Sequence, residues 1–165
     1  MTILVSDTSV LIDLGRGGLL EGSFSCSLPI AVPDVLYERE LQSQNGPYLR
    51  TLGLGVLSLM PDEVSLAQQI WSDQGALSLP DCFALCCALR PNYVLLTGDR
   101  ALRSEALSRT VTVHGLFWLL DQIAAIEQAS TSVLYDGLMR IASHPRCRLP
   151  QAEIRRRLER WSVEP

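Results

Sequence analysis

Lysine is absent from this chain of 165 residues, and all 14 of its basic residues are arginine. The absence excludes any mechanism that depends on a catalytic lysine. Long apolar runs are also missing, because no stretch reaches the roughly 20 residues that a membrane span needs. The first residues lack the basic region, apolar core and cleavage site of a signal peptide. We therefore expect a cytoplasmic protein without a membrane partner.

The cysteines and histidines lack the spacing of a zinc site. No C-x-x-C occurs, and His114 and His144 lie far from the main cysteine group. Cys82 and Cys86 fall on one face of an apolar helix, where cysteine commonly fills a core. We expect buried thiols rather than a catalytic or disulfide role for the five cysteines, which are Cys26, Cys82, Cys86, Cys87 and Cys147.

The composition is that of a globular protein. Hydrophobic residues make up 47 % of the chain and charged residues 19 %, which is enough apolar material for one domain with a real core. The net charge of −4 does not by itself indicate nucleic-acid binding. The exclusive use of arginine nevertheless suits phosphate contacts, because a guanidinium group can bind phosphate through two parallel hydrogen bonds.

Short apolar segments alternate with helical patterns through the first two thirds of the chain. We expect strands at 3–5, 28–32, 56–59, 93–97 and 110–113, and helices at 10–20, 35–41, 48–52, 63–72, 81–89 and 101–107. Such alternation predicts a parallel five-stranded sheet with helices on both faces. Beyond residue 115 the pattern is all helical, with helices expected at 117–129, 132–141 and 151–161.

Carboxylates stand at the ends of the expected elements. Asp7 follows the first strand and Asp99 follows the fourth, so both belong at the carboxyl edge of the sheet, where ligands bind in open parallel sheets. Asp81 begins the apolar helix, and Glu40 lies six residues beyond Asp34, the expected N-cap of its helix. For Asp7 and Asp81, helix capping is the competing interpretation, with Ser78 as an alternative cap for the second helix. If these acids converge, their repulsion indicates a bound divalent cation, Mg²⁺ or Mn²⁺.

Three of these positions lie in recognisable motifs. The segments VSDTSVLID (5–13), LPDCFA (79–84) and LLTGDRALR (95–103) resemble, in order and spacing, the acidic motifs of PIN-domain ribonucleases, which include the VapC-type toxins of toxin–antitoxin pairs. The resemblance covers about residues 1–120. We therefore divide the chain into a nuclease domain, 1–120, and a helical C-terminal extension, 121–165.

The resemblance implies a three-layer α/β/α sandwich and metal-dependent cleavage of RNA by an enzyme that an antitoxin neutralises. The implied metal ligands and catalytic residues are Asp7, Glu40, Asp81 and Asp99. For the second acid, Glu38 is the alternative, and Glu40 is preferred because Leu41 follows it, as in the Glu–Leu pair of the family. Mg²⁺ or Mn²⁺ would be the cofactor.

Hydroxyl and guanidinium groups flank the expected acidic site. Thr8 and Ser9 match the residues usual in the family beside the first acid, and Ser9 or Thr97 could donate to a carboxylate or a metal-bound water. Arg100 and Arg103 could hold a substrate phosphate, although a solvated helix face explains them equally well.

The C-terminal extension allows several interpretations. Its first helix carries Trp118, Ile123 and Ile126, among other apolar residues that could cover the sheet or form a homodimer face. The arginines at 155–157 and 160 could contact RNA, but interspersed glutamates favour a solvated or partner-binding helix.

Two other functional classes remain as alternatives. A non-catalytic PIN-like binding module would share the fold without cutting RNA. A phosphatase of the haloacid-dehalogenase kind also has an Asp after its first strand, but it needs a second Asp at the position of Ser9 and a lysine, so this alternative is weaker.

Overall fold

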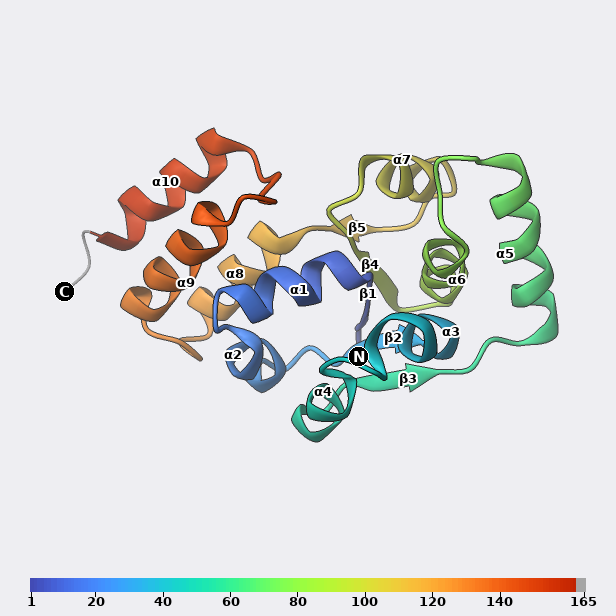
Figure 1. The fold of residues 1–165 in the computed structure, drawn as a ribbon, viewed down its shortest axis with the longest axis horizontal. Helices are drawn as coiled ribbons and strands as arrows, with labels where there is room; N and C mark the ends of the chain where they lie inside the picture. Colours follow the sequence, from blue (N-terminus) through green and yellow to red (C-terminus); the bar gives the residue numbers. More distant parts are fainter. Residues whose placement is uncertain (163–165) are drawn as a thin grey trace.

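A parallel five-stranded sheet forms the centre of the computed structural model, which describes residues 1–162 (Figure 1). Its strand order is β3-β2-β1-β4-β5, and all four neighbouring pairs are parallel. The strands are β1 (Ile3–Ser6), β2 (Ile30–Pro33), β3 (Gly55–Leu57), β4 (Tyr93–Leu96) and β5 (Val113–His114). The expected α/β class and the parallel five-stranded sheet are confirmed.

Helices cover both faces of this sheet. The first part of the chain contributes α1 (Thr8–Arg16), α2 (Leu20–Ser25), α3 (Asp34–Leu36), the π-helical turn η1 (Tyr37–Leu41) and α4 (Gly46–Leu52). The middle contributes α5 (Pro61–Asp73), α6 (Leu79–Ala88) and α7 (Arg100–Ser108). The C-terminal part consists of α8 (Leu116–Ala125), α9 (Thr131–Ser143) and α10 (Gln151–Ser162).

Alternating side chains divide the core into two clusters. Leu4 of β1 and Leu96 of β4 face a cluster formed with α1, α2, α8, α9 and α10. Their neighbours Val5 and Leu95 face a second cluster with α5, α6 and α7. Successive side chains of a strand point to opposite faces, so each strand serves both layers. Figure 1 shows the two helical layers on either side of the sheet.

Two expected elements differ from the structure near the N-terminus. The helix expected at 10–20 ends at Arg16, because Gly18 takes a left-handed conformation (φ +65°) and α2 starts afresh at Leu20. The expected cap at Asp34 is wrong by one position, since Pro33 precedes the helix and Asp34 is its first residue. The Asp34 carboxylate still accepts a hydrogen bond from the N–H of Val35, at 2.8 Å.

Helix α8 is buried in the core cluster on one face of the sheet, and α9 and α10 pack beyond it, against α1 and against each other. Leu119, Leu120 and Ile123 are fully buried in the first cluster, as the sheet-covering interpretation predicts, whereas 41 % of Ile126 is exposed. Trp118 is half-buried, and its ring stacks on His114 at a centroid distance of 4.0 Å.

The arginines of α10 are mostly engaged within the protein. Arg157 is buried and forms ion pairs of 2.7 Å with Asp121 of α8 and with Glu153. Arg160 also pairs with Asp121, at 2.8 Å, and Arg156 pairs with Glu153, at 2.7 Å. Arg157 therefore links α8 and α10 inside the protein and does not belong to a solvated face or an RNA-binding surface.

Candidate functional site at the carboxyl edge of the sheet

Asp7 lies at the end of β1 and caps α1. Its Oδ1 accepts hydrogen bonds from the N–H of Val10, at 3.1 Å, and from the hydroxyl of Ser9, at 2.8 Å. Its Oδ2 accepts a hydrogen bond from the hydroxyl of Thr97, at the end of β4. The side chain is thus a helix cap and also part of a polar group at the sheet edge, so the two interpretations of Asp7 are compatible.

Thr97 joins Asp7 to Asp99. The fully buried Thr97 hydroxyl donates to Asp7 and accepts a hydrogen bond from the N–H of Asp99, at 3.0 Å. Asp99 itself caps α7 by accepting from the N–H of Leu102, at 2.8 Å. Because β1 and β4 are neighbouring parallel strands, their carboxyl ends bring these side chains together.

Asp81 occupies the first turn of α6 but is not its cap. Ser78 is the cap, and its Oγ accepts from the N–H of Asp81, at 3.2 Å, while the Asp81 carboxylate accepts from the N–H of Ser78, at 3.4 Å. This reciprocal pair is a capping box. The structure therefore favours Ser78, which the sequence left as the competing cap, and it leaves Asp81 half-buried at the helix start.

Glu40 reaches the same region from η1. The hydroxyl of Thr8 donates a hydrogen bond to Glu40 Oε2, so Glu40 lies next to the residue that follows Asp7. The N–H of Gln42 bonds to the carbonyl of Tyr37, at 2.8 Å, which defines the π-helical turn. Glu38, the alternative second acid, is exposed.

The acids repel one another across this edge. Burial is the main cause that raises the pKa of Asp81, and the charges of Asp99 and Glu40 raise it further, against the hydrogen bonds from Ser78. Burial likewise raises the pKa of Asp7, with a further contribution from the charge of Asp81, and its hydrogen bonds oppose this shift. The charges of Asp99, Glu40 and Asp7 are therefore near enough to that of Asp81 to interact with it.

The side-chain oxygen atoms at this edge can be compared with the ligands that divalent cations prefer. Four carboxylates and three hydroxyls supply only oxygen, which suits Mg²⁺ or Mn²⁺ and not zinc. Within residues 1–162, however, no three His, Cys, Asp or Glu side chains are grouped closely enough to hold a metal ion. The chemistry of the donors fits such an ion, and the carboxylates here are instead engaged with helix N-termini and hydroxyls.

A cleft of about 570 Å³ adjoins the acids. Three parts of the chain line it: Ser9, Asp13 and Arg16 of α1, Gly98 and Asp99 after β4, and residues 145–149 of the α9–α10 loop. Sequence reasoning did not identify Arg146 and Arg148 in this loop. The alternation of arginine with Cys147 and Leu149 is the signal that could have found them.

The two arginines expected to hold substrate take different positions. Arg100 is the first residue of α7, exposed beside Asp99. Arg103 is half-buried, and a Cβ on Gly115 would lie 3.4 Å from its guanidinium group. Its charge, after the larger effect of burial, lowers the pKa of His114. Arg103 therefore lies toward the junction of β5 and α8.

All five cysteines are free thiols, and four of them are buried. Cys147, the exception, is half-buried and lines the cleft. Burial raises the pKa of Cys82 to about 11 and that of Cys86 to about 12, which suppresses thiolate formation. The burial expected for the α6 cysteines is confirmed.

Comparison with known families gives one result. A family model described as a PIN domain, DUF3368, matches residues 3–162 and so extends through α10. PIN domains are typically nucleases. A comparison with curated proteins finds no match. In the described residues, no helix is both long enough and apolar enough to cross a membrane.

Proposed function

This chain belongs to the PIN-domain family, and on that premise we propose that it is a metal-dependent endoribonuclease that hydrolyses phosphodiester bonds in RNA. The observation that carries the proposal is that four carboxylates, each from a different part of the chain, belong to the same edge of the sheet. Asp7 and Asp99 share Thr97, Glu40 contacts Thr8, and the charges of Asp99 and Glu40 act on Asp81.

We propose that Asp7, Glu40, Asp81 and Asp99 hold Mg²⁺ or Mn²⁺. A bound ion of this kind orients a phosphate, lowers the pKa of a water molecule and stabilises the leaving oxygen. It would also offset the repulsion from Asp99 and Glu40, which adds to the effect of burial in raising the pKa of Asp81. The remaining tasks fall to the chain itself. Ser9 and Thr97 fix both oxygens of Asp7, and Thr8 orients Glu40 toward the same edge.

Substrate contacts next to the acids would come from arginine. Arg100 is exposed at the start of α7 and directly follows Asp99, so it is suited to neutralise a phosphate that approaches this carboxylate. Arg103 is directed toward Gly115, which favours a structural role or a contact with a more distant phosphate.

We further propose that the enzyme is the toxin of a toxin–antitoxin pair. Asp99 is exposed and Glu40 is half-buried, so a partner protein can reach the acidic edge and block it. A neighbouring gene for a small DNA-binding protein that co-purifies with this chain and stops its cleavage of RNA would support the toxin role. A nuclease without such a neighbour would act outside a toxin pair.

The decisive experiment is cleavage of a mixed pool of structured RNAs by the purified protein with Mg²⁺, with Mn²⁺ and with chelator. Asp7→Asn and Asp99→Asn serve as test variants, because asparagine also caps helices and should preserve the fold. We expect metal-dependent cutting that falls by on the order of 100-fold or more in both variants.

The outcomes separate the proposals. Cutting that persists unchanged in Asp7→Asn would report a contaminating ribonuclease and contradict the assignment. Folded protein that binds RNA with metal but never cuts it would instead identify a non-catalytic binding module. The separation of the carboxylates within the described residues is the observation that favours this second candidate.

A further inference from the structure

The cleft beside Asp99 is built from segments far apart in the sequence. Residues of α1 face the α9–α10 loop across it, and Ser9 and Asp99 connect it directly to the acidic edge. Figure 1 shows the loop returning from α9 toward the region where α1 and α7 begin. A polymer held at the carboxylates would therefore have this cleft as a continuous path along the surface.

The loop is anchored so that its arginines face outward. The N–H of Arg146 donates to Nδ1 of His144, at 3.1 Å, and the N–H of Cys147 donates to the carbonyl of His144, at 3.0 Å. Cys147 and Leu149 are half-buried against the first core cluster. Arg146 and Arg148 alternate with them and are exposed.

The charges of the cleft come from separate segments of the chain. Five charged side chains line it: Arg16, Arg146, Arg148, Asp13 and Asp99. Asp13 and Arg16 form a salt bridge of 3.5 Å, so they largely offset each other. Neither Arg146 nor Arg148 forms a salt bridge within residues 1–162. The uncompensated charge is therefore acidic at Asp99 and basic on the loop.

We infer that this cleft binds the sugar–phosphate backbone of single-stranded RNA, with Arg146 and Arg148 holding phosphates to one side of the bond that is cleaved. The inference rests on the proposed nuclease function. The acids repel phosphates, so a strand needs cationic contacts immediately beyond them, and guanidinium groups provide these bidentately. Ile12, which is 45 % exposed, adds an apolar contact for a ribose or base.

If the cleft recognises the sugar–phosphate backbone, we expect it to accept RNA strands of different base sequence. The lining residues within the described chain include no aromatic side chain on which a base could stack. Phosphate contacts fix the register of a strand without reading its bases. The selectivity of the enzyme for particular RNAs would then arise elsewhere or from RNA shape.

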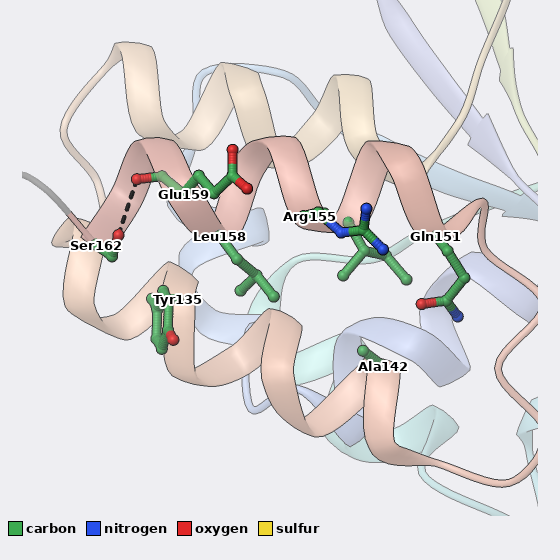
Figure 2. Close-up of a pocket in the computed structure, with 8 residues that line it drawn as sticks. Tyr135, Ala142, Gln151, Arg155, Leu158, Glu159 and Ser162 are labelled. Carbon is green, nitrogen blue, oxygen red and sulfur yellow. Dashed lines mark hydrogen bonds between the residues drawn. The ribbon is translucent and has the colours of Figure 1, made fainter.

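A matched control lies on the other side of the C-terminal region. Figure 2 shows a second hollow, of about 340 Å³, between α9 and α10, with Arg155 on its α10 side. Arg155 and Arg156 are exposed and do not line the cleft. Changing both removes the same charge as changing Arg146 and Arg148, so a general charge effect would appear equally in both double variants.

The experiment measures binding of a fluorescent single-stranded oligoribonucleotide of about 12 nucleotides, within the range of site sizes for single strands, by anisotropy in chelator. We expect Arg146→Ala/Arg148→Ala to weaken binding at least about tenfold and to reduce the salt slope by about 1.4, or 0.7 per lost phosphate contact. Arg155→Ala/Arg156→Ala should remain near the wild type. Arg146→Lys/Arg148→Lys should restore the salt slope and part of the affinity. An acidic peptide of equal charge tests a protein ligand in place of RNA.

Each result bears on one proposal. Three results would overturn the cleft assignment. The two alanine double variants could bind RNA equally well, or the wild type could bind no RNA. Arg146→Ala/Arg148→Ala could also lose binding to the acidic peptide while it keeps its binding to RNA. If the wild type cuts RNA with metal and Arg146→Ala/Arg148→Ala has the same KM, the nuclease stands and the cleft assignment fails. If the double variant loses RNA binding while the wild type never cuts, the cleft assignment stands and the nuclease fails.

Discussion

Among individual residues, Thr97 has the most connected position in the site. Its buried hydroxyl donates to Asp7 and accepts from the N–H of Asp99, so one side chain sets the relation between two acids. A buried hydroxyl that both donates and accepts has little freedom to rotate. The Asp7 carboxylate is therefore held in place before any ligand binds, which is the usual requirement for a catalytic group.

Glu40 and Glu38 provide a matched pair for testing the acidic site. They lie two positions apart in η1, yet Glu40 contacts Thr8 whereas Glu38 is exposed. We expect Glu40→Gln to reduce metal-dependent RNA cleavage by about tenfold or more, since one charged ligand is worth at least about 1.4 kcal/mol. Glu38→Gln should cut like the wild type. The measurement is the initial rate over a range of Mg²⁺ concentrations.

The Mg²⁺ concentration needed for half-maximal cutting distinguishes the possible roles of Glu40. A ligand that is lost raises the Mg²⁺ concentration needed for half-maximal cutting, whereas a purely structural residue lowers activity at every concentration alike. If Glu38→Gln shows the larger defect, the assignment of the second acid is reversed.

Some of these residues could be predicted from sequence and others could not. Asp7 and Asp99 follow buried strands, and parallel topology alone brings their positions together. The preference for Glu40 over Glu38 has two grounds, the Glu–Leu pair of the family and the distance from the expected cap at Asp34, and the structure moves that cap to Pro33. A regular helix pattern does not fix where a π-helical turn will point a side chain. Arg146 and Arg148 enter the cleft through a long-range return of the chain, which local pattern does not encode.

Among the elements, η1 lies in close contact with the start of α4. A Cβ on Gly46, the first residue of α4, would lie 2.6 Å from the carbonyl oxygen of Leu41, the last residue of η1. Such a distance requires backbone movement in the turn that carries Glu40. Extra turns of the π type occur often at functional sites, and here the neighbouring glycine makes room for one.

We therefore expect Gly46→Ala to destabilise the protein by about 1–3 kcal/mol, the range for overpacking. The substitution should also lower RNA cleavage more than the loss of folded protein explains, because Glu40 moves with the turn. Gly75→Ala is the control, since a Cβ at Gly75 meets nothing within 4 Å. Urea unfolding and cleavage rates of both variants test this. Unchanged stability in Gly46→Ala would show that the turn relaxes freely.

The sequence predicts the existence of most helices and strands better than their boundaries. Strands β1, β2 and β4 appear within two residues of their expected limits, because buried apolar runs between turn residues leave little choice. The separate helix α2 was not expected. Gly18 is left-handed, and a Cβ on the adjacent Gly17 would lie only 2.8 Å from Ile141 Cδ1 and 3.0 Å from the carbonyl oxygen of Gly137 in α9, which explains why the chain breaks there.

Across the whole molecule, the C-terminal helices complete one of the two core layers. Leu11 and Leu14 of α1 share the first cluster with Leu138 and Ile141 of α9 and with Trp161 of α10. Removing everything beyond residue 120 would expose these side chains of α1 to water. The boundary drawn at 120 from sequence is still a prediction, and the packing favours unfolding of all helices together.

The ion pair between Asp121 of α8 and Arg157 of α10 can be used to test whether the helices unfold together. Asp121 holds the guanidinium group of the buried Arg157, which also lies over the ring of Phe117 at 4.5 Å. We expect Asp121→Ala to lower the free energy of unfolding by about 2 kcal/mol, because Arg157 keeps Glu153 as a partner but loses its better-shielded one. Asp136→Ala, at an exposed carboxylate of α9 that forms no salt bridge within residues 1–162, is the control.

Chemical modification of the buried cysteines of α6 measures the same unfolding on the opposite face of the sheet. Cys82 and Cys86 lie in the second cluster, so a thiol reagent reaches them only when that layer opens. If the molecule unfolds as one unit, Asp121→Ala should speed their modification by about 30-fold at low reagent reactivity, the factor that corresponds to about 2 kcal/mol. The half-buried Cys147 reacts from the native state and should change little in rate. Unchanged rates at Cys82 and Cys86, despite a lower melting temperature by circular dichroism, would instead mean that the C-terminal helices unfold by themselves.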